Sequence, residues 1–401
     1  MNIRKFYFRQ LFNDLMPIYP LYILMFQDKG VSVQQISILL VIWSISTVVL
    51  EIPSGIIADR WSRKLLVSMG SLFQGACYLT WLLSDGFFMY AIGFVLWGIG
   101  GAFKSGAEEA LLYDSLKQES RDDTFDRCLG KGRFLSGVGN IIASVAGGFI
   151  GMKYSYNSAL LLSITSGLIS AVIAFTYKEA NYYKSRSKEL LKDTDHDTLR
   201  EAFSFLLKNK EILIFSLLLI TVVSTAGILD EYDQLIARDY GLSTVGIGIW
   251  AAIRFLLIAI GGYMAHGIKK VIQKISKKKD AIRILGIVCM LASACLVLAG
   301  LLKFIAIMSV YGLFYLIMSA GDVIGEDYIQ ARIEDEGRST VHSILSLSYN
   351  LYGSLFILAY GLMLRWIKLL DSLVIVAAYM VVLITLWRVL YARLKRVNGM
   401  R

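Results

Sequence analysis

Residues 40–66 read LVIWSISTVVLEIPSGIIADRWSRKLL and change character twice. An apolar run with one acid, Glu51, gives way to the charged stretch Asp59–Lys64, after which the chain turns apolar again. A run of about 20 apolar residues is long enough to cross a hydrocarbon core about 30 Å thick at about 1.5 Å per residue. The stretch therefore predicts two membrane helices joined by a short charged turn.

The same pattern recurs along the whole chain of 401 residues. Hydrophobic residues make up 56% of it and charged residues 18%, against roughly 45–50% and about 25% in soluble domains. The excess is gathered into runs of about 20 residues, so we expect an all-α membrane protein with twelve transmembrane helices. The expected helices are 6–27, 33–57, 65–83, 87–115, 134–152, 156–177, 211–236, 243–267, 282–302, 304–330, 340–364 and 370–393.

The longest polar stretch divides these helices six against six. We expect an N-terminal bundle at residues 1–177, a cytoplasmic linker with a short amphipathic helix at 178–210, and a C-terminal bundle at 211–401. The segment DKGVS at Asp28–Ser32 returns as DYGLS at Asp239–Ser243. Weak internal duplication of this kind is typical of transporters built from repeated bundles.

The net charge of +10 is mostly a signal of topology. Lysine and arginine are concentrated in alternate loops and at both ends of the chain, so the positive-inside rule predicts cytoplasmic termini in a multi-pass protein of the inner (plasma) membrane. No soluble basic domain is recognisable, so we expect no nucleic-acid partner, and we expect a monomer that binds a small-molecule substrate within the lipid bilayer. The four cysteines and three histidines lack the spacing of metal ligands, and we expect neither a metal nor a cofactor.

The stretch PSGIIADRWSRK, residues 53–64, resembles the loop between helices 2 and 3 of the major facilitator superfamily, whose pattern is G-x-x-x-D-R-x-x-R-[KR]. The wider wording EIPSG…ADR, together with SGAEEALLYDSLK at residues 105–117, is most similar to bacterial drug-efflux-like members. The resemblance implies two pseudo-symmetric six-helix bundles that rock about a central site, with this loop in a cytoplasmic gate. The matching positions are Gly55, Asp59, Arg60, Arg63 and Lys64, with Ser62 where the family usually has glycine.

We expect acids of a neighbouring helix to complete this gate. Glu109 and Asp114 approach the cytoplasmic end of the helix 87–115. Asp59 is placed to cap the N-terminus of a neighbouring helix. The alternative, that the cations of the loop only set the topology, leaves Asp59 unexplained. The cations within reach of the two acids are Arg60, Arg63 and Arg133.

Two acids of the first half lie inside apolar helices. An unpaired acid in the membrane is costly, so Glu51 and Asp14 are each expected to face a cavity or a partner. For Glu51, structural pairing and a role in handling protons or substrate are equally open. Two of the chain's three prolines follow Asp14 and are expected to bend its helix. Asp14 is our leading candidate for a carboxylate that binds a proton or a cation. The alternative is a buried partner of Arg9 or Arg254.

The helix 87–115 carries the densest set of charges. Lys104 and Glu108 are four residues apart, which is the spacing of an ion pair on one helix face. We expect this pair, and Glu108 is a second candidate for handling protons or substrate. Where the family often carries an arginine in this helix, the chain has Phe94, so the family arginine's role does not transfer.

The second half has its own charged residues. Arg254, near the middle of an apolar helix, needs a counter-ion, for which Asp14, Asp322 or an anionic substrate would serve. Asp322 and Glu326 roughly mirror the acids of the helix 87–115 and are candidates for proton or substrate handling. The residues expected to form a solvated outer vestibule are Asp230, Glu231 and Asp233.

The segment GVGNIIASVAGGFIG, residues 137–151, is rich in small residues. Families that exchange substrate for protons often show G-x-x-x-G-P-x-x-G-G here, and the chain matches this frame only in degenerate form. Ordinary close packing of small residues explains the segment equally well. The residues in the frame are Gly139, Ala143, Ser144, Gly147 and Gly148.

These observations favour a secondary transporter that works by alternating access. The acid-rich candidates and the drug-efflux-like resemblance favour proton-coupled export of amphipathic small molecules or drugs, cations among them. The alternative is a proton-coupled importer of a polar or anionic nutrient, in which Arg254 would hold the anionic group. We recognise no ATP-binding loop and no nucleophile–base set, so we expect no enzyme, and the proton gradient is the expected source of energy.

Overall fold

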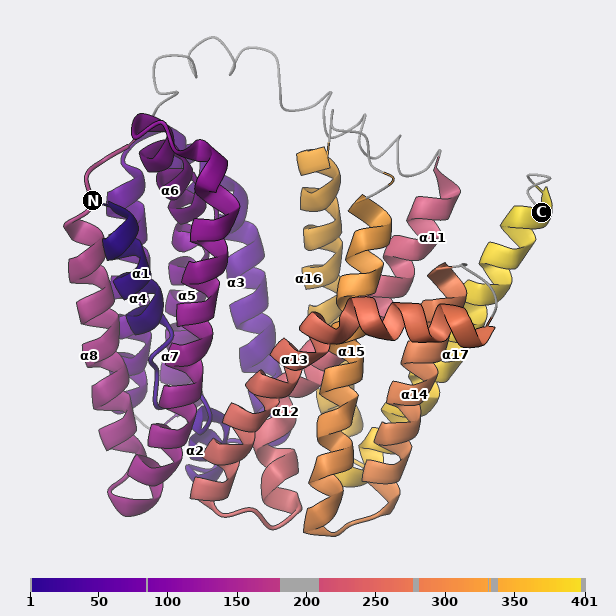
Figure 1. Cartoon of the computed structure of the whole chain (residues 1–401). Coiled ribbons are helices and arrows are strands. Elements are labelled where there is room, and N and C mark those ends of the chain that lie inside the picture. The colour runs from indigo at the N-terminus through magenta and orange to yellow at the C-terminus, as the bar shows by residue number, and fades with distance from the viewer. Residues whose placement is uncertain are drawn as a thin grey trace. The chain divides into compact units, whose positions relative to one another are not determined.

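The computed structural model describes residues 2–83, 86–180, 209–276, 281–330, 332 and 338–397. Throughout these residues the regular structure is helical (Figure 1). The first half contains α1 (Asn2–Asn13), α2 (Tyr22–Asp28), α3 (Val33–Arg60), α4 (Arg63–Leu83), α5 (Phe87–Lys104), α6 (Ala107–Gln118), α7 (Phe125–Lys153) and α8 (Tyr156–Phe175). The second half contains α11 (Lys210–Leu218), α12 (Thr225–Asp239), α13 (Thr244–Ser276), α14 (Ala281–Leu301), α15 (Met308–Gln330), α16 (Arg338–Met363) and α17 (Leu369–Val397).

Ten stretches of the described chain are long and apolar enough to cross a membrane. Two expected spans are outside this set. The span 6–27 is divided between α1 and α2, and the span 340–364 corresponds to α16. The all-helical membrane fold is confirmed, whereas the count of twelve remains a prediction. The amphipathic helix expected in the linker lies outside the described residues.

Two helices expected to be continuous are interrupted near charged residues. The first stops at Asn13 and resumes at Tyr22, because Pro17 and Pro20 cannot donate backbone hydrogen bonds within a helix. The helix expected at 87–115 stops at Lys104 and resumes at Ala107. Between them Gly106 has φ +68°, in the left-handed region that glycine tolerates without steric cost. In both places the expectation of one continuous helix is wrong.

A third interruption divides the helix expected at 211–236. Leu219–Val223 form a π-helical turn between α11 and α12, and the backbone N–H of Ser224 donates to the carbonyl of Leu219, five residues earlier (3.1 Å). Such π-helical turns are frequently found at functional sites. No proline or glycine in Leu219–Val223 signals this turn in the sequence.

The chain divides into two compact units. The N-terminal unit comprises residues 1–193, 243–252 and 360–362, and the C-terminal unit comprises 194–242, 253–359 and 363–401. The expected domain boundaries at 177 and 211 remain predictions.

The N-terminal unit is held together by close helix packing and by an aromatic core. A Cβ added to Gly70 of α4 would lie 2.8 Å from the carbonyl oxygen of Gly100 of α5, so only glycine allows these helices to approach so closely. The rings of Phe94 and Trp97 are stacked with centroids 6.1 Å apart, and Trp81 packs against both. Phe94 is 1% exposed, so the position where the family often has arginine is here part of an apolar core.

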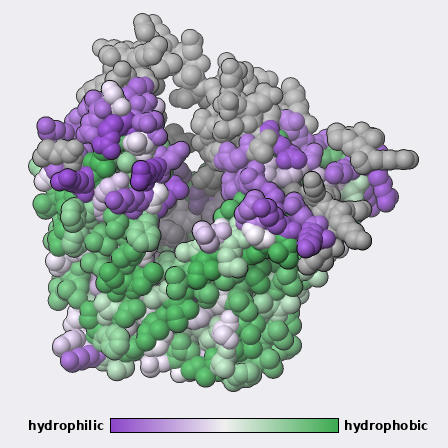
Figure 2. All heavy atoms as spheres, in the orientation of Figure 1, coloured by the Kyte–Doolittle hydropathy of each residue, from purple (hydrophilic) through white to green (hydrophobic). Residues whose placement is uncertain are grey.

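The outer surface of the N-terminal unit matches a lipid environment. Large apolar side chains such as Phe88, Leu161 and Val172 are exposed along its flanks. In Figure 2 these flanks form a broad apolar belt, whereas hydrophilic residues gather at the end of the unit where α6 lies. A helical surface of this composition favours a position within the bilayer.

The C-terminal unit is packed in a similar way around α14, α15 and α17. A Cβ added to Gly300 of α14 would lie 3.0 Å from the carbonyl oxygen of Leu370 of α17. A Cβ added to Gly261 of α13 would lie 2.1 Å from the carbonyl oxygen of Leu316 of α15. The second approach fixes α15 against α13 and thereby helps to position the acids that α15 carries.

Candidate functional site

The charged turn between α3 and α4 is organised by two residues that cap α4. The hydroxyl of Ser62 accepts a hydrogen bond from the backbone N–H of Leu65 (3.3 Å). The carboxylate of Glu179 accepts from the backbone N–H of Arg63 (3.1 Å), and it also accepts from the hydroxyl of Ser62. An acid at a helix N-terminus is favoured by the unpaired N–H groups and the helix dipole. The sequence did not single out Glu179, because it lies 116 residues from Arg63.

The side chains of Asp59 and Arg60 lie outside the described residues, so the capping role expected of Asp59 stays a prediction. Gly55 lies on α3, and a Cβ added to it would meet no atom of the described chain within 4 Å. The ammonium of Lys64 lies 5.5 Å from the ring centroid of Phe175 on α8. Lys64 therefore contacts an aromatic ring at the end of the same unit.

The structure brings together two ion pairs expected from the sequence. Arg63 Nη1 lies 2.5 Å from Asp114 Oδ2, and both side chains are less than a tenth exposed. Arg133 Nη2 lies 3.3 Å from Glu109 Oε1, and both of these side chains are exposed. The first pair is buried and rigidly placed, whereas water screens the second. Whether either pair opens and closes as a gate stays a prediction.

Arg9 on α1 and Glu108 on α6 form a second buried pair of charges in the N-terminal unit. Arg9 is 1% exposed and Glu108 is 7% exposed. Two nitrogens of the Arg9 guanidinium donate to the two oxygens of the Glu108 carboxylate, which is the two-pronged geometry that this ion pair favours. Glu108 is oriented toward Arg9 because it lies in the first turn after the interruption at Gly106.

The pair expected between Lys104 and Glu108 is wrong. Lys104 instead donates to the side-chain oxygens of Asn13 (2.9 Å) and Gln74. The four-residue spacing predicts a shared helix face only where the helix is continuous, and here the chain leaves the helical path between Lys104 and Ala107.

Asp14 lies directly after the last residue of α1. Its carboxylate accepts hydrogen bonds from the side chain of Asn13 (3.1 Å) and from the hydroxyl of Ser136 on α7. Arg9 donates to the same Asn13 (3.3 Å). Hydrogen bonds therefore lead from Glu108 through Arg9 and Asn13 to Asp14. One alternative for Asp14 was a direct ion pair with Arg9. Among the described residues this pair does not form, because Arg9 pairs with Glu108.

Glu51 lies on α3 and is partly exposed. Its carboxylate forms no hydrogen bond or ion pair with the side chains that the structure describes.

In the C-terminal unit, Arg254 of α13 is buried among groups of α12 and α15. It is 3% exposed and pairs with Asp230 and with Asp233, the latter at 3.3 Å. The hydroxyl of Tyr315 donates to Asp233 (3.4 Å), and the guanidinium lies 5.6 Å from the ring centroid of Tyr315. One cation is thus shared by two acids in an aromatic setting.

This arrangement corrects two expectations. The counter-ions of Arg254 are Asp230 and Asp233, not Asp14 or Asp322. Asp233 is 2% exposed, so a vestibule of solvated acids is wrong for this residue, while Glu231 is partly exposed. The physical reason is that α12 continues to Asp239, so the acids lie within the helix and not at its end. Asp230 and Asp233, three residues apart, then share one face.

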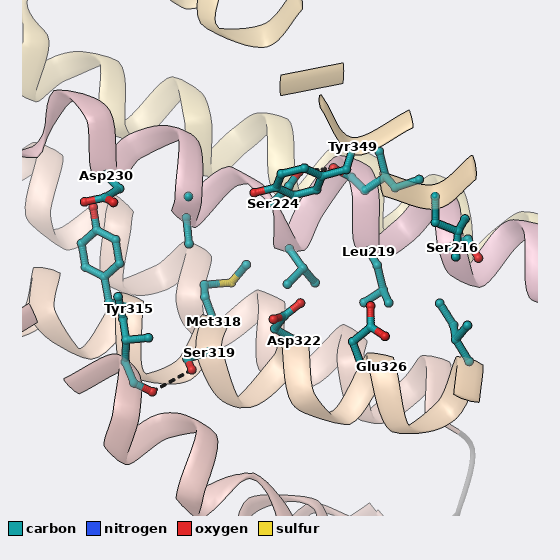
Figure 3. Close-up of a pocket in the computed structure, with 17 residues that line it drawn as sticks. Ser216, Leu219, Ser224, Asp230, Tyr315, Met318, Ser319, Asp322, Glu326 and Tyr349 are labelled. Atoms are coloured by element: carbon teal, nitrogen blue, oxygen red, sulfur yellow. Dashed lines mark hydrogen bonds between the residues drawn. The ribbon is translucent and has the colours of Figure 1, made fainter. Parts of the chain in front are cut away.

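A cavity of about 460 Å³ lies in the C-terminal unit next to this cluster (Figure 3). The π-helical turn forms one wall, with Leu219, Ile220 and Val223, and α15 forms the opposite wall. Asp322 and Glu326 both line the cavity, and in Figure 3 both carboxylates rise from α15 toward the wall that carries Leu219. The sequence singled out both acids. It missed the serines of the cavity, because single serines are common in apolar helices; these are Ser216, Ser224 and Ser319.

The comparison with known families decides the class of the protein. A family model for the Major Facilitator Superfamily matches residues 8–357. The chain belongs to this superfamily. It is therefore a multi-pass membrane transporter of the MFS type. The resemblance of residues 53–64 to a loop of this superfamily is confirmed at the level of the superfamily. The drug-efflux-like subtype is not part of that match.

Individual relatives are distant. The chain is 20% identical over 246 residues to the uncharacterized MFS-type transporter YxaM of Bacillus subtilis (strain 168), and the match covers 61% of this chain and only 59% of that relative's length. The nucleoside transporter NupG superposes with a TM-score of 0.75 at 15% identity, over 98% of this chain and 99% of that one. A bacterial homologue of the human lysosomal transporter Spinster, inward-facing and occupied, gives 0.71 at 16% identity over 98% and 96%. Identities this low show the fold alone.

Proposed function

We propose that this MFS transporter exports amphipathic small molecules by alternating access, with energy from protons that move in the opposite direction. The observation that carries the proposal is the chain of hydrogen bonds that leads from the buried pair Glu108 and Arg9 through Asn13 to the partly buried Asp14. Ionisable groups inside membrane segments are expensive to bury and mark ion pathways and substrate sites. Here two carboxylates, each able to take a proton, are connected through one buried arginine.

Protonation of a carboxylate at either end of this chain of hydrogen bonds would change the conformation that the protein favours. A proton on Glu108 removes the charge that balances Arg9, and Arg9 is then left charged in a medium of low dielectric constant. The conformation that offers Arg9 another partner or water becomes favoured. A proton on Asp14 similarly removes its charge and turns one of the two oxygens that accept from Asn13 and Ser136 into a donor. Binding of a proton on one side of the membrane and its release on the other then shift the balance between two states.

The cavity of the C-terminal unit supports an amphipathic substrate. About half of the residues that line it are apolar and the rest carry hydroxyl or carboxylate groups, so the cavity offers both an apolar surface and polar partners to a small molecule. The direction of transport rests on the resemblance of the segments EIPSG…ADR and SGAEEALLYDSLK to drug-efflux-like members.

We further propose that the pairs Arg63–Asp114 and Arg133–Glu109 belong to the cytoplasmic gate, as the motif match at the α3–α4 turn implies. Arg63–Asp114 keeps α4 and α6 together within the N-terminal unit, so that the turn moves with the unit as one body. The topology proposed with this gate has both termini in the cytoplasm, in the plasma membrane, and a monomer as the working unit.

The second candidate is a proton-coupled importer of a polar or anionic nutrient. It requires Arg254 to hold the anionic group. In this structure Arg254 is buried and already has two carboxylate partners, so an anion would have to displace Asp230 or Asp233. This burial favours the exporter over the importer.

The test uses inside-out membrane vesicles with an acidic interior and a pH-sensitive dye. Lipophilic cations, neutral antibiotics, sugars and organic anions are added one at a time. We expect an amphipathic compound to release protons through the wild type and not through Asp14→Asn. If release survives in Asp14→Asn but is lost in Glu108→Gln, export stands and Glu108 carries the proton. If no compound releases protons, proton-coupled export is wrong.

The same assay tests the gate. Asp114→Asn breaks the pair with Arg63, and we expect it to slow proton release at least about tenfold while compound binding persists, because the gate acts on the conformational step. Asp122→Asn, an exposed acid near the same end of the unit, is the matched control. Equal rates in the two variants would contradict a gating role for Asp114.

A further inference from the structure

We infer that the cavity of the C-terminal unit binds an organic ammonium ion with an apolar body, and that Asp322 and Glu326 share its charge. This inference rests on the proposed transport function and names its substrate class. Asp322 and Glu326 are four residues apart on α15 and therefore lie on one face of the helix, about one turn apart. Both face the cavity between α15 and the π-helical turn (Figure 3).

The charge of the cavity is unbalanced. Asp230 also lines it, but it shares the cation Arg254 with Asp233. Asp322 and Glu326 form no ion pair or hydrogen bond with the described residues, and no lysine or arginine is among the residues that line the cavity. Two carboxylates without a cation, inside a membrane segment, favour a positively charged ligand and disfavour an anion.

A buried hydroxyl at the same cavity lacks a partner. Ser216 is 1% exposed, and its Oγ has no hydrogen-bond partner among the described residues, although Ser216 lines the cavity. Buried polar atoms in folded proteins are nearly always paired, so an unpaired one calls for an explanation. The oxygen is closed off in the empty cavity, so the Ser216 side chain would turn toward a bound ligand, whose N–H groups would then supply the partner, because an ammonium donates to a hydroxyl oxygen and to carboxylates alike.

The remaining walls fit an apolar body with a cationic group. Leu219, Val223 and Met318 line the cavity, and methionine adapts its shape to varied ligands. Tyr349 of α16 also lines it and offers an aromatic ring, which attracts ammonium groups. The absence of a side chain at Gly227 keeps room for the Tyr349 hydroxyl, which lies 2.9 Å from where a Cβ would be. The volume of about 460 Å³ suits a compact organic molecule.

A metal ion is a poorer fit to the same acids. Hard divalent cations such as Ca²⁺ take six to eight oxygen ligands. Within the part of the chain that the structure describes, no group of three or more His, Cys, Asp or Glu side chains is arranged to hold a metal. The pair Asp322 and Glu326 therefore suits a ligand that brings its own apolar surface.

The test is calorimetric titration of the purified full chain in detergent, with detergent alone as the blank. The two probes are dibenzylammonium and dibenzyl ether, which share a shape but differ in charge and in the N–H donors. We expect the ammonium to bind at least about tenfold more tightly than the ether. Asp322→Asn and Glu326→Gln should each weaken ammonium binding at least about tenfold, since each removes one charged partner. Asp322→Glu, which keeps the charge, should stay within about threefold of the wild type.

The matched control is Asp327→Asn. Asp327 lies next to Glu326 and is exposed as Asp322 and Glu326 are, but it does not line the cavity and it pairs with Lys269 at 2.7 Å. It should bind the ammonium as the wild type does. Equal binding of ammonium and ether, no binding of the ammonium, or equal losses in Asp327→Asn and Asp322→Asn would each overturn the inference.

The outcome is separable from that of the transport assay. If neutral compounds release protons from vesicles while the ammonium does not bind, the proposed export stands and the inference fails. If the ammonium binds with the expected dependence on Asp322 and Glu326 but no compound releases protons, the binding site stands and proton-coupled export fails.

Discussion

At the scale of single residues, charges inside apolar helices could be found in the sequence, but their partners could not. Arg254 is conspicuous because its neighbours are apolar, and Glu108 because it belongs to a dense set of charges in an otherwise apolar helix. The partner of Glu108 is Arg9, 99 residues away, and nothing local in the sequence connects them. The expected partner Lys104 was wrong because side-chain spacing predicts pairs only within one unbroken helix. Phe94, by contrast, could be recognised from the sequence as a departure from the family, and it lies in an aromatic core.

The Arg9–Glu108 pair gives a prediction about stability. Glu108→Gln keeps the shape of the side chain and leaves the charge of Arg9 buried without compensation. Removal of one partner of a buried ion pair typically costs about 3–5 kcal/mol. We expect a clearly lower midpoint of thermal unfolding for the purified protein in detergent. A double variant, Arg9→Gln with Glu108→Gln, should recover most of the loss.

The neighbouring acid supplies the control. Glu109→Gln makes the same chemical change one residue away, but Glu109 and its partner Arg133 are both exposed. Exposed ion pairs contribute about 0–1 kcal/mol, so this variant should unfold close to the wild type. If Glu108→Gln and Glu109→Gln unfold at the same temperature, the buried pair does not contribute as described.

At the scale of elements, the helices themselves follow from hydropathy, whereas the interruptions were only partly visible. Pro17 and Pro20 predict a bend, and the structure shows a full break. Gly106 becomes a break because it adopts positive φ, a choice that depends on tertiary contacts. The π-helical turn at Leu219–Val223 has no local signal, since its residues are ordinary apolar ones. These interruptions of the helices nevertheless determine where Asp14, Glu108 and the cavity wall lie.

The packing of α7 against the break that follows α1 gives a prediction at this scale. A Cβ added to Gly147 would lie 2.0 Å from the carbonyl oxygen of Pro17, so Gly147→Ala must push the two segments apart. Overpacking of this kind typically costs about 1–3 kcal/mol, which we expect as a lower thermal midpoint.

Gly137→Ala is the control on the same helix, because a Cβ there meets no described atom within 4 Å. It should be neutral or slightly stabilising, since alanine favours a helix interior over glycine. Should Gly147→Ala prove as stable as Gly137→Ala, α7 does not pack as closely against Pro17 as the structure indicates. The degenerate glycine frame of α7 would then need an explanation other than packing.

At the scale of the whole molecule, the family could be recognised from one loop, but the chemistry of transport could not. The motif at Gly55–Lys64 and the runs of apolar residues identify an MFS transporter, and the family match over residues 8–357 agrees. Substrate and direction depend on a few side chains in cavities, which the fold leaves free to vary. Solved structures at 15–16% identity share the architecture, but they do not decide the substrate or the direction of transport.

The central claim is that outward movement of substrate is driven by inward movement of protons. The most direct test is transport into proteoliposomes that contain the purified chain, with the electrical potential clamped at zero by equal potassium and valinomycin. Each compound of the vesicle panel is measured with an acidic lumen and then with an alkaline lumen. We predict accumulation of an amphipathic compound only with the acidic lumen, abolished by a protonophore and by Asp14→Asn together with Glu108→Gln. Accumulation only with the alkaline lumen would mean that protons and substrate move together, and the importer would replace the exporter.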